Sequence, residues 1–241
     1  IGSKLKYCDQ AIKLAGRMNI MLPSLYKLKG NCYMDIGDLV SALEWFIKAA
    51  NFYKDHGNNT GLATVYMSIA EAYNMQGNHN NEKYYLRNAI KIFRQEKDSV
   101  KLAITLTNMG YANYTMGQYD SALIYYSGTA DIYKDMDRKS DYAYCIGNSG
   151  LVYSKLSDFN RAEDYLLQAI EILTKLDDKR AVTEYLIEYA NILQHKGEID
   201  RAAAVANQAF VSSVKNGYKE YERDAAHELA RLYQFSGRYD S

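Results

Sequence analysis

The stretch GNCYMDIGDLVSALEWFIKAA (30–50) contains the pattern that decides the fold. It places a small residue at Gly30, an aromatic residue at Tyr33, a second glycine at Gly37, and then Ala42 and Phe46. Spacings of three and four residues on both sides of Gly37 are typical of amphipathic helices. Glycine tolerates the left-handed conformation that a tight turn between helices often needs. The stretch therefore predicts two helices joined by a short turn.

This pattern recurs every forty residues along the whole chain. The small turn residue stands at Gly37, Gly77, Gly117, Ser157, Gly197 and Gly237. Seven residues earlier, where two helices would approach closely, each position holds glycine or alanine: Gly30, Ala70, Gly110, Gly150, Ala190 and Ala230. A repeat of this length indicates a stacked helical array, so we predict an all-α solenoid of antiparallel helix pairs.

The repeat also predicts the domain organisation. We expect residues 1–241 to form one solenoid whose first element, 3–17, is the second helix of an incomplete leading repeat. The full repeats are expected at 24–60, 61–100, 101–140, 141–180 and 181–220, followed by the first helix of a truncated repeat at 221–241. Because an array needs polar caps at its ends, we interpret the chain as a fragment of a longer protein.

A start signal is expected for the second helix of each repeat. Asp and Asn accept hydrogen bonds from the unpaired amides at a helix N-terminus. They predominate three residues after the turn, at Val40, Asn80, Asp120, Asn160, Asp200 and Asp240. We predict that these residues cap the helices.

Composition and charge exclude several classes of function. The chain has 29 Lys+Arg and 29 Asp+Glu, so its formal net charge of zero does not support a basic surface for nucleic acid or an anionic membrane. No apolar run reaches the length of a transmembrane helix. Cys8, Cys32 and Cys145 form no CxxC pair or zinc-ligand spacing, and we interpret Cys32 and Cys145 as buried core residues.

The repeat resembles the tetratricopeptide repeat family, whose small–aromatic–Gly–Tyr–Ala–aromatic–Ala pattern matches residues 24 to 241 almost throughout. The forty-residue form is similar to the longer variants found in kinesin light chains, polarity adaptors and bacterial regulators. Departures from the pattern stand at His79, Glu82, Asn113, Ser157 and Ala206. The resemblance implies a right-handed superhelix in which the first helix of each repeat lines a concave groove that binds a peptide.

The resemblance also assigns residues to that groove. Asn recurs there at equivalent positions, and an amide that donates and accepts suits the backbone of an extended peptide; tyrosine adds rigid contact area. The peptide-binding residues predicted in this way are Lys27, Asn31, Asn74, Asn108, Tyr111, Tyr114, Tyr144, Asn148, Glu188, Asn191 and Glu228. Lys27 and Lys29 make one end of the groove basic. The other end is acidic, with Glu184, Glu188, Asp224 and Glu228, and favours a partner with basic residues.

Catalytic and metal-binding patterns are weak. HELAR (227–231) lacks the second histidine of HExxH, and His195 and His227 with nearby glutamates predict at most an adventitious metal site. KLKGN (27–31) resembles half of the carboxylate clamp that chaperone-binding proteins use, but Ser68 and Ile104 replace other clamp residues. We expect no catalytic residue and no cofactor.

The sequence therefore predicts a non-enzymatic scaffold that binds a protein or peptide, most simply the regulatory or sensory region of a larger signalling protein. The alternatives are a free-standing intracellular adaptor and the targeting arm of an enzyme whose catalytic domain is absent. Homo-oligomerisation through the terminal helices is a further option. The compartment stays open between the cytoplasm and, for a bacterial membrane-bound sensor, the periplasm.

Overall fold

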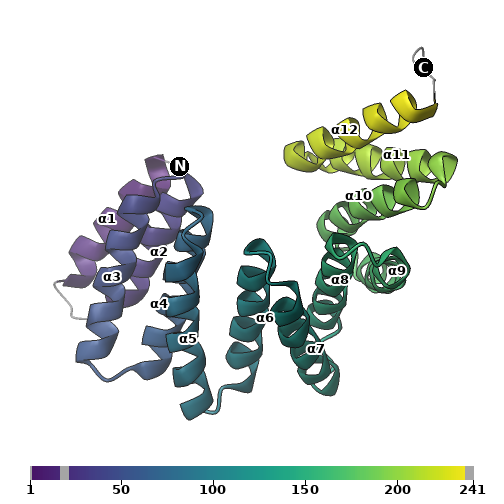
Figure 1. Ribbon diagram of the computed structural model, residues 1–241. Coiled ribbons are helices and arrows are strands. Elements are labelled where there is room, and N and C mark those ends of the chain that lie inside the picture. Colours follow the sequence, from purple (N-terminus) through teal and green to yellow (C-terminus); the bar gives the residue numbers. More distant parts are fainter. Residues whose placement is uncertain (1, 17–21, 237–241) are drawn as a thin grey trace. The chain divides into compact units, whose positions relative to one another are not determined.

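The computed structural model describes residues 2–16 and 22–236, and all regular structure in these residues is α-helical (Figure 1). The predicted all-α fold of stacked helix pairs is confirmed. The helices are α1 (Gly2–Gly16), α2 (Leu22–Asp35), α3 (Leu39–Asp55), α4 (Asn59–Met75), α5 (His79–Gln95), α6 (Ser99–Thr115), α7 (Tyr119–Asp135), α8 (Lys139–Lys155), α9 (Phe159–Lys175), α10 (Lys179–His195), α11 (Ile199–Asn216) and α12 (Lys219–Ser236).

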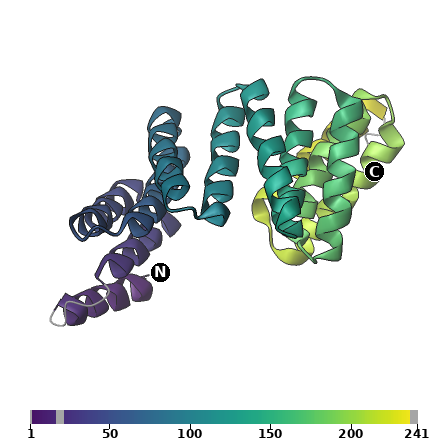
Figure 2. The same ribbon diagram turned by 90° about the horizontal axis from the view of Figure 1, so that it is seen from below.

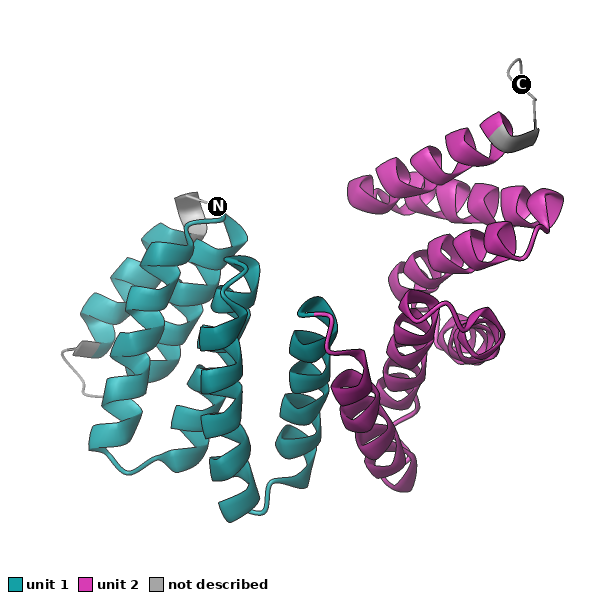
Figure 3. Cartoon of the chain, viewed as in Figure 1, with its two compact units in different colours: residues 1–116 teal, residues 117–241 magenta. Residues whose placement is uncertain are grey.

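The chain forms two compact units, residues 1–116 and 117–241 (Figure 3). Within each unit, consecutive helices pack side by side and run in opposite directions, as Figures 1 and 2 show. Even-numbered helices, the first helices of the predicted repeats, also contact one another: α2 with α4 in the first unit, and α10 with α8 and α12 in the second. The assignment of repeat boundaries given above stays a prediction.

The turns between helices share one backbone conformation. The predicted left-handed conformation is confirmed at Gly37, Gly77, Gly117 and Gly197, and Ser157 adopts it with φ 59°; Gly237 lies outside the described residues. The turns between repeats have the same conformation at Gly57, Lys97, Asp137, Asp177 and Gly217. A left-handed residue thus recurs every twenty residues, and the helices α3 to α10 between these turns have seventeen residues each.

The predicted helix caps were wrong by two residues. The residue directly after the left-handed position is the cap: Asp38, Asn78 and Asp158 accept hydrogen bonds from the backbone amides of Ser41, Asn81 and Arg161. The helix begins immediately after this cap, so the positions predicted from the sequence fall inside its first turn. There, Asp120 and Asp200 place negative charge near the positive end of a helix dipole. Asp240 lies outside the described residues.

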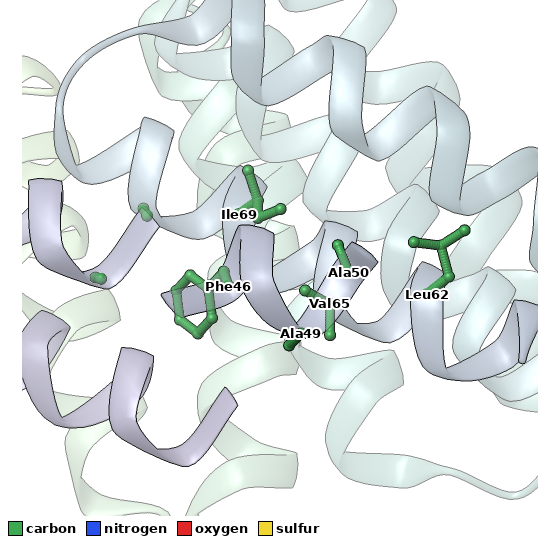
Figure 4. Close-up of a cluster of buried hydrophobic side chains, with 8 residues drawn as sticks. Phe46, Ala49, Ala50, Leu62, Val65 and Ile69 are labelled. Carbon is green, nitrogen blue, oxygen red and sulfur yellow. The ribbon is translucent and has the colours of Figure 1, made fainter. Parts of the chain in front are cut away.

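Core packing explains the small residues that precede each turn. A Cβ atom added to Gly30 would lie 2.4 Å from the Phe46 ring, and one added to Gly150 would lie 2.8 Å from Leu166 Cγ. The predicted close approach of helices is therefore confirmed at both glycines. Phe46 belongs to a buried cluster with Ala49, Ala50, Leu62, Val65 and Ile69 from α3 and α4 (Figure 4). Ala230, in the last described helix, is exposed.

Two departures from the repeat pattern form a pair. Glu82 occupies a core position that is alanine in the other repeats, and its side chain is almost completely buried. His79 Nδ1 lies 2.9 Å from Glu82 Oε2, and Asn74 Nδ2 donates to Glu82 Oε1 at 3.1 Å. The buried carboxylate is therefore satisfied by the other unusual residue of the same helix, as a buried polar group requires.

Candidate functional site

The first unit has a cavity of about 440 Å³ on the side of its first helices. Helices α2, α4 and α6 supply its walls, and two side chains of α5 reach it as well. It is lined by Lys27, Thr64, Met67, Ser68, Ala70, Glu71, Asn74, Glu82, Leu86, Asn108 and Tyr111. The size is that of a site for a small ligand or for one or two side chains of a peptide.

Four of the predicted residues meet at this cavity: Lys27, Asn74, Asn108 and Tyr111. Asn108 and Tyr111 are exposed on α6, whereas Asn74 donates to Glu82 and is part of the buried network. Tyr114 lies beside the cavity, with its ring centroid 6.3 Å from that of Tyr111.

The charges around this cavity are mixed. Desolvation raises the pKa of the Glu71 carboxyl, and the positive charge of Lys27 partly opposes this effect. Asn31 is half-buried on α2 and does not line the cavity. Lys29, predicted to make this end of the groove basic, does not lie there. It is buried, forms an ion pair with Asp9 of α1, and has its Nζ atom 3.9 Å from the centre of the Trp45 ring.

In the second unit, two predicted residues take part in the structure of the scaffold. The Tyr144 hydroxyl donates to Asp178 Oδ2 at 2.6 Å, and burial together with this bond raises the pKa of the tyrosine. Asn148 Oδ1 accepts from the hydroxyl of the buried Tyr185 at 3.2 Å. Asn148 is half-buried, so its amide is shared between the core and the surface.

The other predicted residues of this unit are Glu188 and Asn191 on α10 and Glu228 on α12. Asn191 Nδ2 donates to Glu188 Oε1 at 3.3 Å, and the Ser154 hydroxyl donates to the same oxygen. Arg231 forms an ion pair with Glu228 Oε2 at 3.2 Å. Glu188 and Asn191 are therefore bonded to each other, and Glu228 is paired with a residue of its own helix.

Glu228 is unusual among the predicted residues. It is 5% exposed, and its Oε1 is the one buried side-chain oxygen or nitrogen in the described residues without a hydrogen-bond partner. Desolvation is the largest cause that raises the pKa of its carboxyl, and the negative charge of Glu188 raises it further. The acceptor is therefore costly to bury and suited to a donor or a cation.

Sequence reasoning missed several residues that shape these surfaces. Leu86 and Glu82 reach the cavity of the first unit from a second helix, and Ser154 and Tyr185 hold Glu188 and Asn148 in the second unit. Only Glu82 carried a signal, as a charged residue at a position that is otherwise alanine.

The described residues do not reproduce the weak metal pattern. His195 stacks on Phe159, with ring centroids 4.8 Å apart, and Glu228 pairs with Arg231 of the HELAR segment. No group of three or more potential metal ligands occurs in residues 2–16 and 22–236. In the same residues, we find no helix with the length and apolar character needed to cross a membrane.

Comparison with known proteins agrees with this architecture. Residues 101–175 match the family model of the tetratricopeptide repeat. Among curated proteins, none matches the sequence significantly. The apo form of RapI has a similar structure, with a TM-score of 0.76 and 19% sequence identity, and the match covers 92% of this chain and 78% of RapI.

Two further solved structures are similar. The apo form of the quorum sensor NprR from B. thuringiensis has a TM-score of 0.73 and 18% identity, covering 100% of this chain and 67% of NprR. A Rap protein complexed with Competence and Sporulation Factor has a TM-score of 0.64 and 16% identity, covering 90% of this chain and 64% of that protein. The chain spans about two thirds of the length of these two proteins. Residues 101–175 therefore match tetratricopeptide repeats, and the chain has the fold of these solved structures.

Proposed function

We propose that this chain is a non-enzymatic binding scaffold whose first helices hold an extended segment of a partner protein. The observation that carries the proposal is the cavity of the first unit, where Asn74, Asn108 and Tyr111 from two neighbouring first helices meet. Amide side chains donate to and accept from a peptide backbone without regard to its sequence. A partner segment would therefore lie across α4 and α6.

The same cavity offers a place for one side chain of the partner. Met67, Ala70 and Leu86 supply apolar surface in it, and Thr64, Ser68 and Asn108 supply polar groups. An apolar side chain that enters would bury its surface at about 25 cal/mol per Å². Backbone contacts would give affinity here, and the entering side chain would give specificity.

The second unit supports a preference for basic partners. Glu188 and Glu228 occupy equivalent positions on neighbouring first helices, and Glu228 has the unpartnered buried oxygen. Glu184 is exposed nearby on α10, where it accepts a hydrogen bond from the Tyr221 hydroxyl at 2.8 Å. Lysine or arginine in a partner segment would complement these charges and speed association.

We further propose that the chain is the regulatory or sensory region of a larger signalling protein. Support comes from proteins of similar structure, which include a quorum sensor and a Rap protein complexed with Competence and Sporulation Factor. In such a protein, occupation of the first-helix surfaces would alter the output of another domain. The full-length protein provides the test. Its activity should change when a peptide that binds this chain is added.

A peptide-display screen tests the binding proposal directly. The intact chain is screened beside Asn108→Ala, which removes an exposed amide from the cavity. Its matched control is Asn51→Ala, which removes an exposed asparagine from the second helix α3 in the same unit. We expect peptides that bind the intact chain and the control but bind Asn108→Ala at least about tenfold more weakly, the loss of about 1.4 kcal/mol.

Three results would count against the proposal. No enrichment on the intact chain would contradict peptide binding by the first helices. Equal loss in both asparagine variants would indicate a general effect, and retention in Asn108→Ala with loss in Asn51→Ala would place the binding surface on the second helices. Thermal melting of all three proteins verifies that they fold alike.

A further inference from the structure

Two cysteine thiols face each other across the contact between α1 and α2. Cys8 of α1 and Cys32 of α2 lie with their Sγ atoms 4.0 Å apart, and each residue is 5% exposed. A disulfide has an S–S length of about 2.05 Å, so the two sulfurs need to approach by about 2 Å. Neither residue is oxidised in the structure.

The repeat shows which residues stand at the equivalent positions elsewhere in the chain. QAIKL (10–14) is in register with QAIEI (168–172), so Cys8 corresponds to Leu166 and to Phe46. Cys32 lies forty residues before Ala72. Phe46 and Ala72 share one core cluster, so the two cysteines occupy the two sides of a contact that is otherwise apolar.

The third cysteine has a different environment. Cys145 of α8 is completely buried, and its Sγ lies 3.2 Å from the Thr129 hydroxyl of α7. It belongs to the second unit, whereas Cys8 and Cys32 both belong to the first. Two of the three thiols are therefore a pair, and the third is a structural core residue.

We propose that Cys8 and Cys32 are a modification site: a dithiol that low-molecular-weight disulfides such as oxidised glutathione convert to an intrachain disulfide joining α1 to α2. One cysteine thiolate attacks the glutathione disulfide, forms a mixed disulfide and releases one glutathione thiolate. The other cysteine thiolate then attacks the protein sulfur of that bond and releases the second glutathione. The dithiol loses two electrons and two protons, and one oxidised glutathione becomes two reduced molecules.

Access to the pair depends on α1. This helix packs on α2, and both thiols are buried, so a disulfide reagent reaches them only through a local opening of the two helices. Burial, followed by the neighbouring Cys32, raises the pKa of the Cys8 thiol. The first attack, on glutathione disulfide, is consequently slow while α1 is packed on α2 and proceeds when the helices separate. The second attack, which forms the Cys8–Cys32 bond, requires α1 to return to α2.

Oxidation would change the surface that carries Lys27. The disulfide would close a loop between residues 24 positions apart, and such a crosslink removes conformational freedom from the opened state. Helix α1 would then stay on α2, the first wall of the cavity in this unit. The redox state of the surroundings would thereby change how often α1 separates from α2.

The test uses the whole chain with its three cysteines and the variants Cys145→Ser, Cys8→Ser and Cys32→Ala. Each protein is incubated with oxidised glutathione, quenched by alkylation in denaturant so that buried thiols are also labelled, and analysed by peptide mass spectrometry. We expect the alkylated thiols of the intact chain to fall from three to one, with Cys8 linked to Cys32. Cys145→Ser should form the same link, and the other two variants should form none.

Hydrogen exchange of α1 provides the second readout. Oxidation should slow exchange of the α1 amides by roughly tenfold or more in the intact chain and in Cys145→Ser, but not in Cys8→Ser. The incubation is repeated at a temperature where the α1 amides already exchange fast. Three alkylatable thiols at both temperatures would overturn the proposal. A stable glutathione adduct, or a dimer linked between chains, would overturn it too.

Discussion

At the scale of single residues, Glu82 and His79 show how two departures from a repeat support each other. Alanine in place of Glu82, or an apolar residue in place of His79, would follow the pattern of the other repeats. The buried carboxylate is tolerated because His79 and Asn74 satisfy it. The sequence marks both residues as exceptions, but their contact depends on side-chain geometry that the repeat pattern does not contain.

This pairing predicts strong coupling between the two positions. His79→Leu should lower the free energy of unfolding by about 1–3 kcal/mol, because it removes a partner from a buried charge. The double variant His79→Leu/Glu82→Ala should recover most of that loss, because both positions then match the repeat. Urea unfolding of the two single variants and the double variant measures the coupling, and additive losses would contradict it.

Glu228 predicts a particular dependence of stability on pH. Its pKa is raised above the ordinary 4.5, so the folded state binds this proton more tightly than the unfolded state does. Stability is therefore greatest below pH 4.5 for this group and falls as the pH rises through the folded-state pKa. Glu228→Gln should remove the penalty and raise the free energy of unfolding at neutral pH by on the order of 1 kcal/mol.

The control for this prediction is Glu171→Gln. The hydrogen bond from Lys175 lowers the pKa of the exposed Glu171 carboxyl, so its substitution should not stabilise the protein at neutral pH. Denaturant unfolding of each variant at several pH values gives the comparison. A steeper loss of stability with rising pH in Glu228→Gln would show that the sign is wrong.

At the scale of elements, the turns are more uniform than the residues that form them. Lys97 adopts the left-handed conformation with φ 55°, and Gly77 adopts it with φ 70°. A Cβ atom added to Gly77 would meet nothing within 4 Å, so any strain there would come from the backbone alone. Lysine is strained in this conformation, and glycine is not. The turn geometry is therefore set by the packing of the helices on both sides.

Exchanging residues at these turns should change stability in opposite directions. Lys97→Gly should raise the free energy of unfolding by about 0.5–1 kcal/mol, because the relief of strain exceeds the added freedom of the unfolded chain. Gly77→Ala should lower it by about 1 kcal/mol from backbone strain alone. Chemical unfolding measures both, and a gain from alanine at position 77 would contradict the prediction.

The elements also show what the sequence predicts well. Existence, type and order of the helices follow from the spacing of small and apolar residues around Gly37 and its equivalents. The caps were misplaced because Asp is also favourable within the first turn of a helix, where its negative charge lies near the positive end of the helix dipole, so its presence near a helix start does not fix the cap position. The ties of Ser154 to Glu188 and of Tyr185 to Asn148 escaped prediction because they join different helices.

At the scale of the whole molecule, each helix depends mainly on its sequence neighbours. Such arrays derive their stability from individual repeats and the interfaces between adjacent ones. Damage to one core cluster should therefore remain within a few helices. Phe46 and Leu166 provide a matched pair, because each is completely buried against the corresponding glycine of its own unit.

Hydrogen exchange should show this local response. Phe46→Ala should destabilise its surroundings by about 3–5 kcal/mol, with faster exchange in α2, α3 and α4 and little change in the second unit. Leu166→Ala should give the converse, with faster exchange in α8 and α9. A uniform acceleration across both units in either variant would mean that the chain unfolds as one cooperative body.

The even recurrence of left-handed turns gives this architecture a simple way to change length. Every helix from α3 to α10 is followed by the same three-residue connection. A segment of forty residues therefore contains two helices and two connections that fit the helices on either side. A duplication of 120 base pairs in the coding sequence would preserve the phase of each helix wherever it began, because 120 is three times forty. Lineages could thus lengthen or shorten the row of first helices by unequal recombination, without new joints at the insertion points.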